Sequence, residues 1–311
     1  MKKKKIFNKE YDKGNTLFLS FIVFIVIVFI GILIINFSTE VTSNKIALIK
    51  IKGDISLYDS EGFFFSGGAS AESTIKRIER AESDPLVKAI ILEINSGGGT
   101  VVATKEIVTA IKKAEKPIVA WIREVGASGA YWIASAADLI VADYASMTGS
   151  VGVRGSYLEF SELFEKYPIT NQEISSGKYK EVGSPFRNLT ESERQLLLNK
   201  INIIQELFLE EVKTNRGLSE EALERLSTAE IFLGVEAKEL GLVDVLGSKE
   251  EAIDSAEELA NIPSSVIVAY VKEKSFIEKM INTVVQSSYF VGRGIGDSFI
   301  SISNEEVFLA K

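Results

Sequence analysis

The sequence predicts an α/β fold built on a parallel β-sheet. An almost continuous apolar run at residues 87–94 leads into three glycines at 97–99, and a helical pattern with apolar positions from Val101 to Ile111 follows. A second apolar run then occupies residues 118–122. Strands that are apolar on both faces are typical of a sheet covered by helices on both sides. A strand, a crossover helix and a strand in this order favour parallel pairing.

The other expected elements follow from apolar periodicity, capping residues and glycine or proline breaks. Asp84 and Pro85 end the first helical pattern, and Thr190 with Glu193 forms a capping box before a long one. The elements expected outside the central unit are strands at 45–51 and 265–271, helices at 71–82, 158–167, 190–214, from Ser219 and at 250–261, and small mixed elements at 231–247.

The N-terminus predicts a membrane anchor. Residues 17–35, LFLSFIVFIVIVFIGILII, carry no charge and are long enough to cross a bilayer as a helix. No small-residue cleavage site follows, so we expect an uncleaved anchor over residues 17–37. Residues 1–16 contain six lysines and two acidic residues, which places this basic segment in the cytoplasm. We therefore expect a single-pass protein of the cell membrane with its main domain outside the cytoplasm.

Composition excludes several kinds of site. The chain has 311 residues with no histidine and no cysteine, so it cannot form a Ser-His-Asp triad, a cysteine nucleophile, a disulfide or a zinc site of His and Cys ligands. No metal and no cofactor are expected. The net charge of −8, despite the basic N-terminus, makes nucleic acid an improbable partner. A nucleophilic serine in this chain would need another base, and lysine is the known alternative.

Three short segments each have a functional interpretation and a simpler structural one. Ser128 follows the strand at 118–122 and precedes a run of small residues that favours a helix, so it is either an N-cap or a nucleophile at a helix N-terminus. The glycines at 97–99 are either a tight turn or a place where backbone N–H groups face a ligand. The glycine-rich segment 60–70, with three phenylalanines, is either an aromatic plug or an apolar contact surface.

Four motifs in a fixed order resemble the signal peptide peptidase A family, which are membrane-anchored serine–lysine peptidases. The motifs are LEINSGGG at 92–99, ASGAYWIA at 127–134, TGSVGV at 148–153, and SGKYKE at 176–181 with Ser184 and Pro185. Residues 234–244 are a weaker match. Gly97 stands where the family usually has proline, so a looser turn is expected there. The resemblance covers residues 45–270, and residues 271–311 form a C-terminal tail with no assigned role.

The resemblance implies a Clp protease/crotonase-like fold of repeated β-β-α units, and a set of site residues. It makes Ser128 the nucleophile and Lys180 the general base, with Lys178 the alternative, and it places Ser150 beside the lysine. It implies that the oxyanion is held by Gly98 or Gly99 together with Gly129. Lysine titrates near 10.4 in water, and only an apolar, dry site lowers that pKa enough for the neutral amine to act as a base.

The function implied is a serine endopeptidase that degrades cleaved signal peptides or other hydrophobic membrane-associated peptides. A related possibility is a quality-control protease for membrane proteins. The family forms ring- or bowl-shaped homo-oligomers in which a lysine can reach the serine of a neighbouring subunit, so the same is expected here. The alternative from a different class is a non-catalytic, membrane-anchored peptide-binding or scaffold module on a crotonase-like fold.

Overall fold

The computed structural model describes residues 21–30, 44–59, 68–167 and 169–271. Of the predicted anchor at 17–37, only residues 21–30 are described, and they are helical. Within the described ranges, no helix combines the length and apolar character that crossing a membrane requires. The rest of the anchor, the basic segment, most of the phenylalanine-rich segment and all of the C-terminal tail but Val271 lie outside the described residues.

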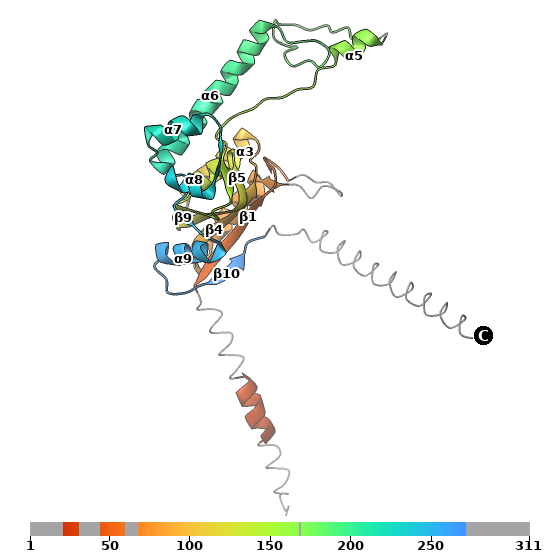
Figure 1. Ribbon diagram of the computed structural model, residues 1–311. Helices are drawn as coiled ribbons and strands as arrows, with labels where there is room; N and C mark the ends of the chain where they lie inside the picture. Colours follow the sequence, from red (N-terminus) through yellow and green to blue (C-terminus); the bar gives the residue numbers. More distant parts are fainter. Residues whose placement is uncertain (1–20, 31–43, 60–67, 168, 272–311) are drawn as a thin grey trace, which may run out of the picture. The chain divides into compact units, whose positions relative to one another are not determined.

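The core of the protein is a mainly parallel sheet, as the sequence predicted (Figure 1). Six of its described strands are paired side by side in parallel, in the order β10 (Val266–Ala269), β1 (Lys45–Lys52), β4 (Val87–Ser96), β5 (Ile118–Ala127), β6 (Leu139–Ala142) and β9 (Val245–Leu246). β7 (Met147–Gly149) pairs in parallel with the end of β5 and antiparallel with β8 (Ile231–Leu233). A separate short pair joins β2 (Ile55–Ser56) and β3 (Ala69–Ser70), and no sequence pattern predicted it.

Helices cover both faces of the sheet because alternate strand residues point to opposite sides. Ile90, Leu92 and Ile94 of β4 share one apolar cluster with buried residues of α2 (Ala71–Ser83), α3 (Val101–Lys113) and α4 (Gly129–Ser135). Ala89 and Ile91 point to the other face, where α9 (Lys249–Leu259) packs. This two-sided burial explains the long apolar runs within β4 and β5.

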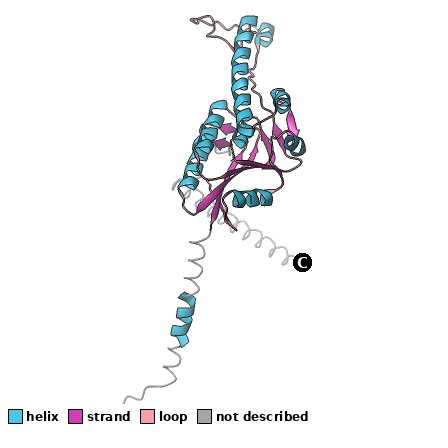
Figure 2. Ribbon diagram, turned by 90° about the vertical axis from the view of Figure 1, so that its left-hand side faces the viewer, coloured by secondary structure: helices cyan, strands magenta, loops and turns pink. Residues whose placement is uncertain are grey.

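The long helix α6 (Glu191–Arg216) begins at the predicted capping box and extends beyond the layers of the sheet (Figure 2). Its C-terminal half packs on the body through Phe208 and Val212, which are both buried. Residues 154–200, which we call the arm, include α5 (Ser161–Lys166) and the first part of α6, and most of them are exposed. Figure 1 shows α5 at the outer end of α6, away from the sheet. The helices α7 (Glu220–Ser227) and α8 (Gly234–Glu239) follow α6 along the chain and lie outside the arm.

The described part of the chain up to Tyr270 forms one compact unit. Most expected elements are present with small changes of boundary, and the expected helix at 158–167 is shortened to α5.

Candidate active site

Ser128 occupies a strained turn between β5 and α4. Its backbone has φ 54° and ψ −128°, in a region that non-glycine residues rarely adopt. Two backbone hydrogen bonds hold the turn: the Ser128 N–H donates to the Gly149 carbonyl at 2.8 Å, and the Trp132 N–H donates to the Ser128 carbonyl at 3.0 Å. Strain of this kind costs on the order of 1–3 kcal/mol and is concentrated at functional sites.

The hydroxyl of Ser128 is not used as a helix cap. Ser128 stands at the N-cap position of α4, but its side chain makes no capping hydrogen bond. The residue is half-buried and lines a groove of about 960 Å³. The capping interpretation of this serine therefore has no support in the structure, and the hydroxyl is free to meet a ligand in the groove.

The glycine turn at 97–99 packs directly against the Ser128 turn. Gly98 has φ +102°, and a Cβ at that position would lie 2.7 Å from the Gly129 nitrogen and 3.0 Å from the Ser128 Cβ. A Cβ on Gly99 would lie 2.0 Å from the Ile55 carbonyl oxygen. Both positions therefore require glycine. A side chain on Gly98 would push the glycine turn away from the Ser128 turn, and one on Gly99 would push it away from Ile55 of β2.

The hydrogen bonds of this turn distinguish the two candidate oxyanion donors. The Gly98 N–H donates to the Ser96 Oγ at 3.1 Å, and that hydroxyl donates to the Gly53 carbonyl at 2.6 Å. The N–H groups of Gly99 and Gly129 make no hydrogen bond within the described part of the chain. A Cβ on Gly129 would lie 3.4 Å from the Gly99 nitrogen, so these two donors are close together. The geometry therefore favours Gly99 over Gly98 as the partner of Gly129.

Ser150 lines the same groove from the segment after β7. It also has a positive φ, of 52°, and its N–H donates to the Glu230 carbonyl at 2.7 Å. Ala127 and Gly149 are paired across β5 and β7, which brings the segments of Ser128 and Ser150 together. The structure thus gathers two of the predicted serines and the glycines around one groove.

The remaining wall of the groove was not identified from the sequence. Trp132 of α4 stacks on Phe208 of α6, with ring centroids 4.1 Å apart and planes 9° from parallel, and both line the groove. Thr104 of α3 is buried and lines it too. Trp132 lies in the ASGAYWIA motif, but no local pattern could show that Phe208 packs on it.

Glu211 fixes the other side of Trp132. Its carboxylate accepts hydrogen bonds from the Trp132 Nε1 at 2.9 Å, from the Lys112 Nζ at 2.9 Å and from the Lys105 Nζ. Burial raises the pKa of Glu211, but the hydrogen bonds from the two lysines outweigh it and hold that pKa below its ordinary value. This ionised group ties α3, α4 and α6 together beside the groove.

The two candidate lysines lie outside the groove. Lys180 is exposed in a turn of the arm, where its N–H donates to the Gly177 carbonyl at 3.1 Å. Lys178 is also exposed, with its Nζ 5.0 Å from the centre of the Tyr179 ring. Of the described residues that line the groove, Asp54 and Arg154 are the ionisable ones, and none is a lysine. A single chain in this arrangement therefore does not bring Lys180 to Ser128.

Comparison with known proteins identifies relatives of this chain. A family model described as peptidase family S49 matches residues 110–263. A protein of Methanocaldococcus jannaschii, provisionally named a protease, is 34% identical over 239 residues, which are 76% of each chain. Protease 4 of Haemophilus influenzae is 32% identical over 221 residues, 70% of this chain and 35% of the relative. The chloroplastic serine protease SPPA of Arabidopsis thaliana is 31% identical over 232 residues, 74% of this chain and 34% of the relative.

A solved structure has a similar fold. A mutant of the 1510-N membrane-bound stomatin-specific protease superposes with a TM-score of 0.50 at 16% identity, covering 75% of this chain and 100% of that one. At this identity the likeness concerns the fold alone.

Proposed function

This chain belongs to peptidase family S49, and we propose that it is a membrane-anchored serine endopeptidase with Ser128 as nucleophile and Lys180 as general base. The observation that carries the proposal is the strained turn at Ser128. Its uncapped hydroxyl faces a groove beside the free N–H groups of Gly99 and Gly129. A free hydroxyl next to two convergent backbone donors suits attack on a peptide carbonyl.

The proposed reaction uses only groups of this chain, the peptide and water. Neutral Lys180 takes the proton of the Ser128 hydroxyl while the oxygen attacks the carbonyl carbon. The Gly99 and Gly129 N–H groups donate to the oxyanion of the tetrahedral intermediate. The lysine ammonium then returns its proton to the leaving amine, and water hydrolyses the acyl-enzyme in a second, equivalent step. Ser150 orients the lysine amine by hydrogen bonding.

The lysine is proposed to come from a neighbouring subunit. The groove of one chain holds no lysine among its described residues, although it holds the serine and the backbone donors. The arm that carries Lys180 exposes many large apolar side chains, which include Leu158, Leu163, Tyr167, Ile169, Ile174 and Leu198. Exposed apolar surface on this scale favours contact with another protein. A second copy of the chain in a ring- or bowl-shaped homo-oligomer would cover the arm and complete the groove.

The substrate is proposed to be a hydrophobic peptide at the membrane, such as a cleaved signal peptide. The aromatic pair Trp132 and Phe208, together with Val101 and Val153, gives the groove apolar walls. The predicted anchor at 17–37 would hold the domain at the outer surface of the cell membrane, with the N-terminus in the cytoplasm. A groove without a base in one chain would also suit the non-catalytic binding module, so the decisive test is hydrolysis.

The test is the rate of cleavage of a hydrophobic peptide by three variants of the full chain. Ser128→Ala should abolish turnover without unfolding, because the side chain makes no cap that could be lost. Lys180→Met keeps the apolar stem but loses the amine, so it should be equally inactive. Lys178→Met is the matched control and should stay active. In the wild type, activity should rise with pH, because only the neutral amine is a base.

Two outcomes would contradict this assignment. An inactive Lys178→Met with an active Lys180→Met would move the role of the base to Lys178. Wild-type rates for both would exclude a lysine base from this loop. Mixing Ser128→Ala subunits with Lys180→Met subunits tests the shared site: partial recovery of activity is expected, and no recovery in confirmed mixed oligomers would place the dyad within one chain.

A further inference from the structure

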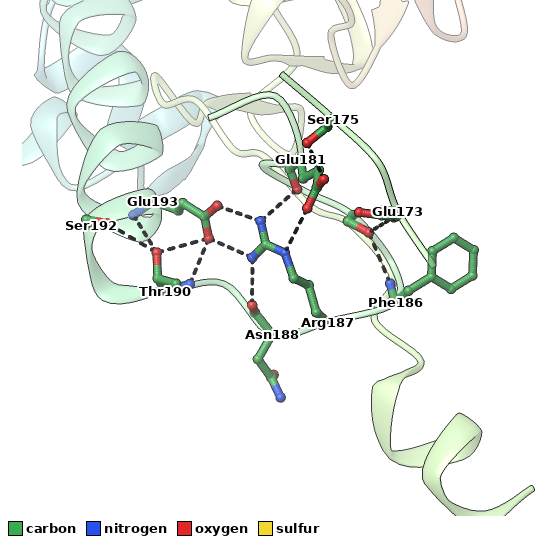
Figure 3. A network of polar contacts seen from close by, with 10 residues as sticks. Glu173, Ser175, Glu181, Phe186, Arg187, Asn188, Thr190, Ser192 and Glu193 are labelled. Atoms are coloured by element: carbon green, nitrogen blue, oxygen red, sulfur yellow. Dashed lines mark hydrogen bonds and ion pairs between the residues drawn. The ribbon is translucent and has the colours of Figure 1, made fainter. Parts of the chain in front are cut away.

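Arg187 joins the turn at residues 176–184, which carries Lys178 and Lys180, to the start of α6 (Figure 3). Its guanidinium forms a bidentate pair with Glu193, with Nη1–Oε2 at 2.9 Å and Nη2–Oε1 at 2.7 Å. The same Nη2 donates to the Glu181 backbone carbonyl at 3.2 Å, and Nε lies 3.7 Å from the Glu181 carboxylate. Nη1 also donates to the Asn188 carbonyl at 3.1 Å. One side chain thus contacts the residue next to Lys180 and the first turn of α6.

Glu193 is a rigid partner for this arginine. Its side chain is only 5% exposed, although most of the arm around it is exposed. It also accepts the Thr190 N–H at 2.8 Å as part of the capping box. The Arg187 hydrogen bonds, helped by Thr190, lower the pKa of Glu193 to about 2, so the pair stays ionised at neutral pH. A planar, bidentate pair fixes direction as well as distance, which a lysine ammonium at the same place could not do.

The turn that carries Lys180 is stabilised by hydrogen bonds within it. The Lys180 N–H donates to the Gly177 carbonyl at 3.1 Å, and the Ser184 N–H donates to the Glu181 carbonyl at 3.0 Å. The Glu181 carboxylate accepts the Ser175 hydroxyl across the same turn. The turn is therefore a compact unit. Arg187 links this turn to the first turn of α6 through its contacts with Glu181 and Glu193.

We propose that Arg187 is a positioning residue that sets the direction in which the turn presents Lys180 to the groove of a neighbouring subunit. The inference rests on the proposed serine–lysine mechanism and deepens it. Arg187 itself stays in the arm and touches neither the substrate nor Ser128. Because a misplacement of about 1 Å in a catalytic group can cost about 10²-fold in rate, loss of the bidentate pair should act on kcat. KM should change little, since every described residue that lines the groove, apart from Arg154, lies outside the arm.

The experiment compares Arg187→Met, Arg187→Lys and the control Arg194→Met in the full-length protein. Arg194 is an exposed arginine of α6, and its side chain forms no hydrogen bond or ion pair within the described part of the chain. Arg187→Met should lower kcat about 100-fold. Arg187→Lys should lower it nearly as much, because an ammonium group cannot form the bidentate pair with Glu193. Arg194→Met should retain wild-type kcat. Oligomer size and helical content, measured first, show that the variants assemble.

Mixed oligomers separate positioning of the lysine from a general structural role. An Arg187→Met subunit keeps a complete serine groove but presents its lysine badly. Mixed with Ser128→Ala subunits, which keep a well-placed Lys180, it should recover activity to the level of a Lys180→Met and Ser128→Ala mixture. Mixed with Lys180→Met subunits it should recover none. A variant that merely weakened the fold would show no such difference between the two partners.

Each contrary result identifies what has failed. Wild-type kcat in Arg187→Met, or rescue by Lys180→Met instead of Ser128→Ala, overturns the role of Arg187. An active Lys180→Met overturns the proposed function, whatever Arg187 does. An inactive Lys180→Met combined with no recovery in the Ser128→Ala and Lys180→Met mixture overturns delivery to a neighbour. If Arg187→Met fails to assemble, Glu193→Gln removes the same bidentate pair from the other side. Glu193→Gln should then give the same pattern of rescue, and failure to show that pattern would overturn the proposal.

Discussion

Replacing Gly98 with alanine should nearly abolish hydrolysis while leaving the protein folded. The new Cβ would lie 2.7 Å from the Gly129 nitrogen, 3.0 Å from the Ser128 Cβ and 3.1 Å from the Ala127 carbonyl oxygen. All three atoms belong to the turn that presents Ser128, and two of them are backbone atoms that cannot rotate away. The methyl group would therefore push the glycine turn off the serine turn and cover the Gly129 N–H.

The size of the effect follows from what is lost. Removing one oxyanion donor costs about 10²–10³ in kcat, or about 3–4 kcal/mol of transition-state stabilisation. The positive φ of Gly98, +102°, adds strain for any L-residue, on the order of 1–3 kcal/mol. A typical domain has about 5–15 kcal/mol of stability, so the variant should remain folded at room temperature. Activity should thus fall far more than stability.

The assay is kcat/KM for a hydrophobic peptide together with denaturant unfolding, and Gly97→Ala is the matched control. A Cβ on Gly97 would meet no atom within 4 Å, and this glycine has no positive φ. Gly97→Ala should therefore behave as wild type in both measurements. Wild-type hydrolysis by Gly98→Ala would refute the contact between the two turns as the basis of the oxyanion site. Equal losses in both variants would refute the geometric distinction between neighbouring glycines.

Three further predictions concern stability, pH and topology. Tyr131→Phe should lower the free energy of unfolding by about 1–3 kcal/mol and leave kcat unchanged. The fully buried Tyr131 hydroxyl donates to the Leu242 carbonyl at 2.9 Å, and its loss leaves a buried acceptor unpaired. A loss of kcat at unchanged stability in denaturant unfolding would contradict this prediction. The pKa of Glu193 is lowered from 4.5 to about 2 on folding, so its stabilising effect is complete above pH 4.5 and is lost as pH falls toward 2. The difference in melting temperature between wild type and Glu193→Gln should accordingly be constant above about pH 5 and shrink below it, and a constant difference down to pH 2 would contradict the charged pair. Protease added outside spheroplasts should digest residues 45–270, and full protection would contradict the predicted orientation.

The parallel sheet could be predicted because a strand that is buried on both faces has a nearly continuous apolar sequence. The run at 118–122 is apolar at every position and the run at 87–94 at all but Lys88 and Glu93, and the structure places them side by side in β4 and β5. Ser128 could be singled out for a similar local reason, since a strand must end and a helix must begin around it. The capping box at Thr190 and Glu193 is equally local and is formed as expected.

Contacts between segments that are distant along the chain could not be predicted from any local sequence pattern. The choice between Gly98 and Gly99 depends on the Ser96 hydroxyl, which engages the Gly98 N–H and leaves that of Gly99 free. The stacking of Phe208 on Trp132 depends on the angle at which α6 crosses α4. Neither follows from periodicity, because each is set by how separate elements meet in three dimensions.

Composition and local pattern by themselves determined a parallel α/β chain with a serine at a strand-to-helix turn, glycines beside it and no histidine or cysteine to assist it. Only the tertiary structure decided that the serine hydroxyl is uncapped, that Gly99 and Gly129 carry the free donors, and that Lys180 stands on the arm outside the groove of its own chain. The reason is physical: a turn or a strand is specified by neighbours along the chain. The distance from a lysine to a serine is specified by the direction in which a long helix leaves the sheet.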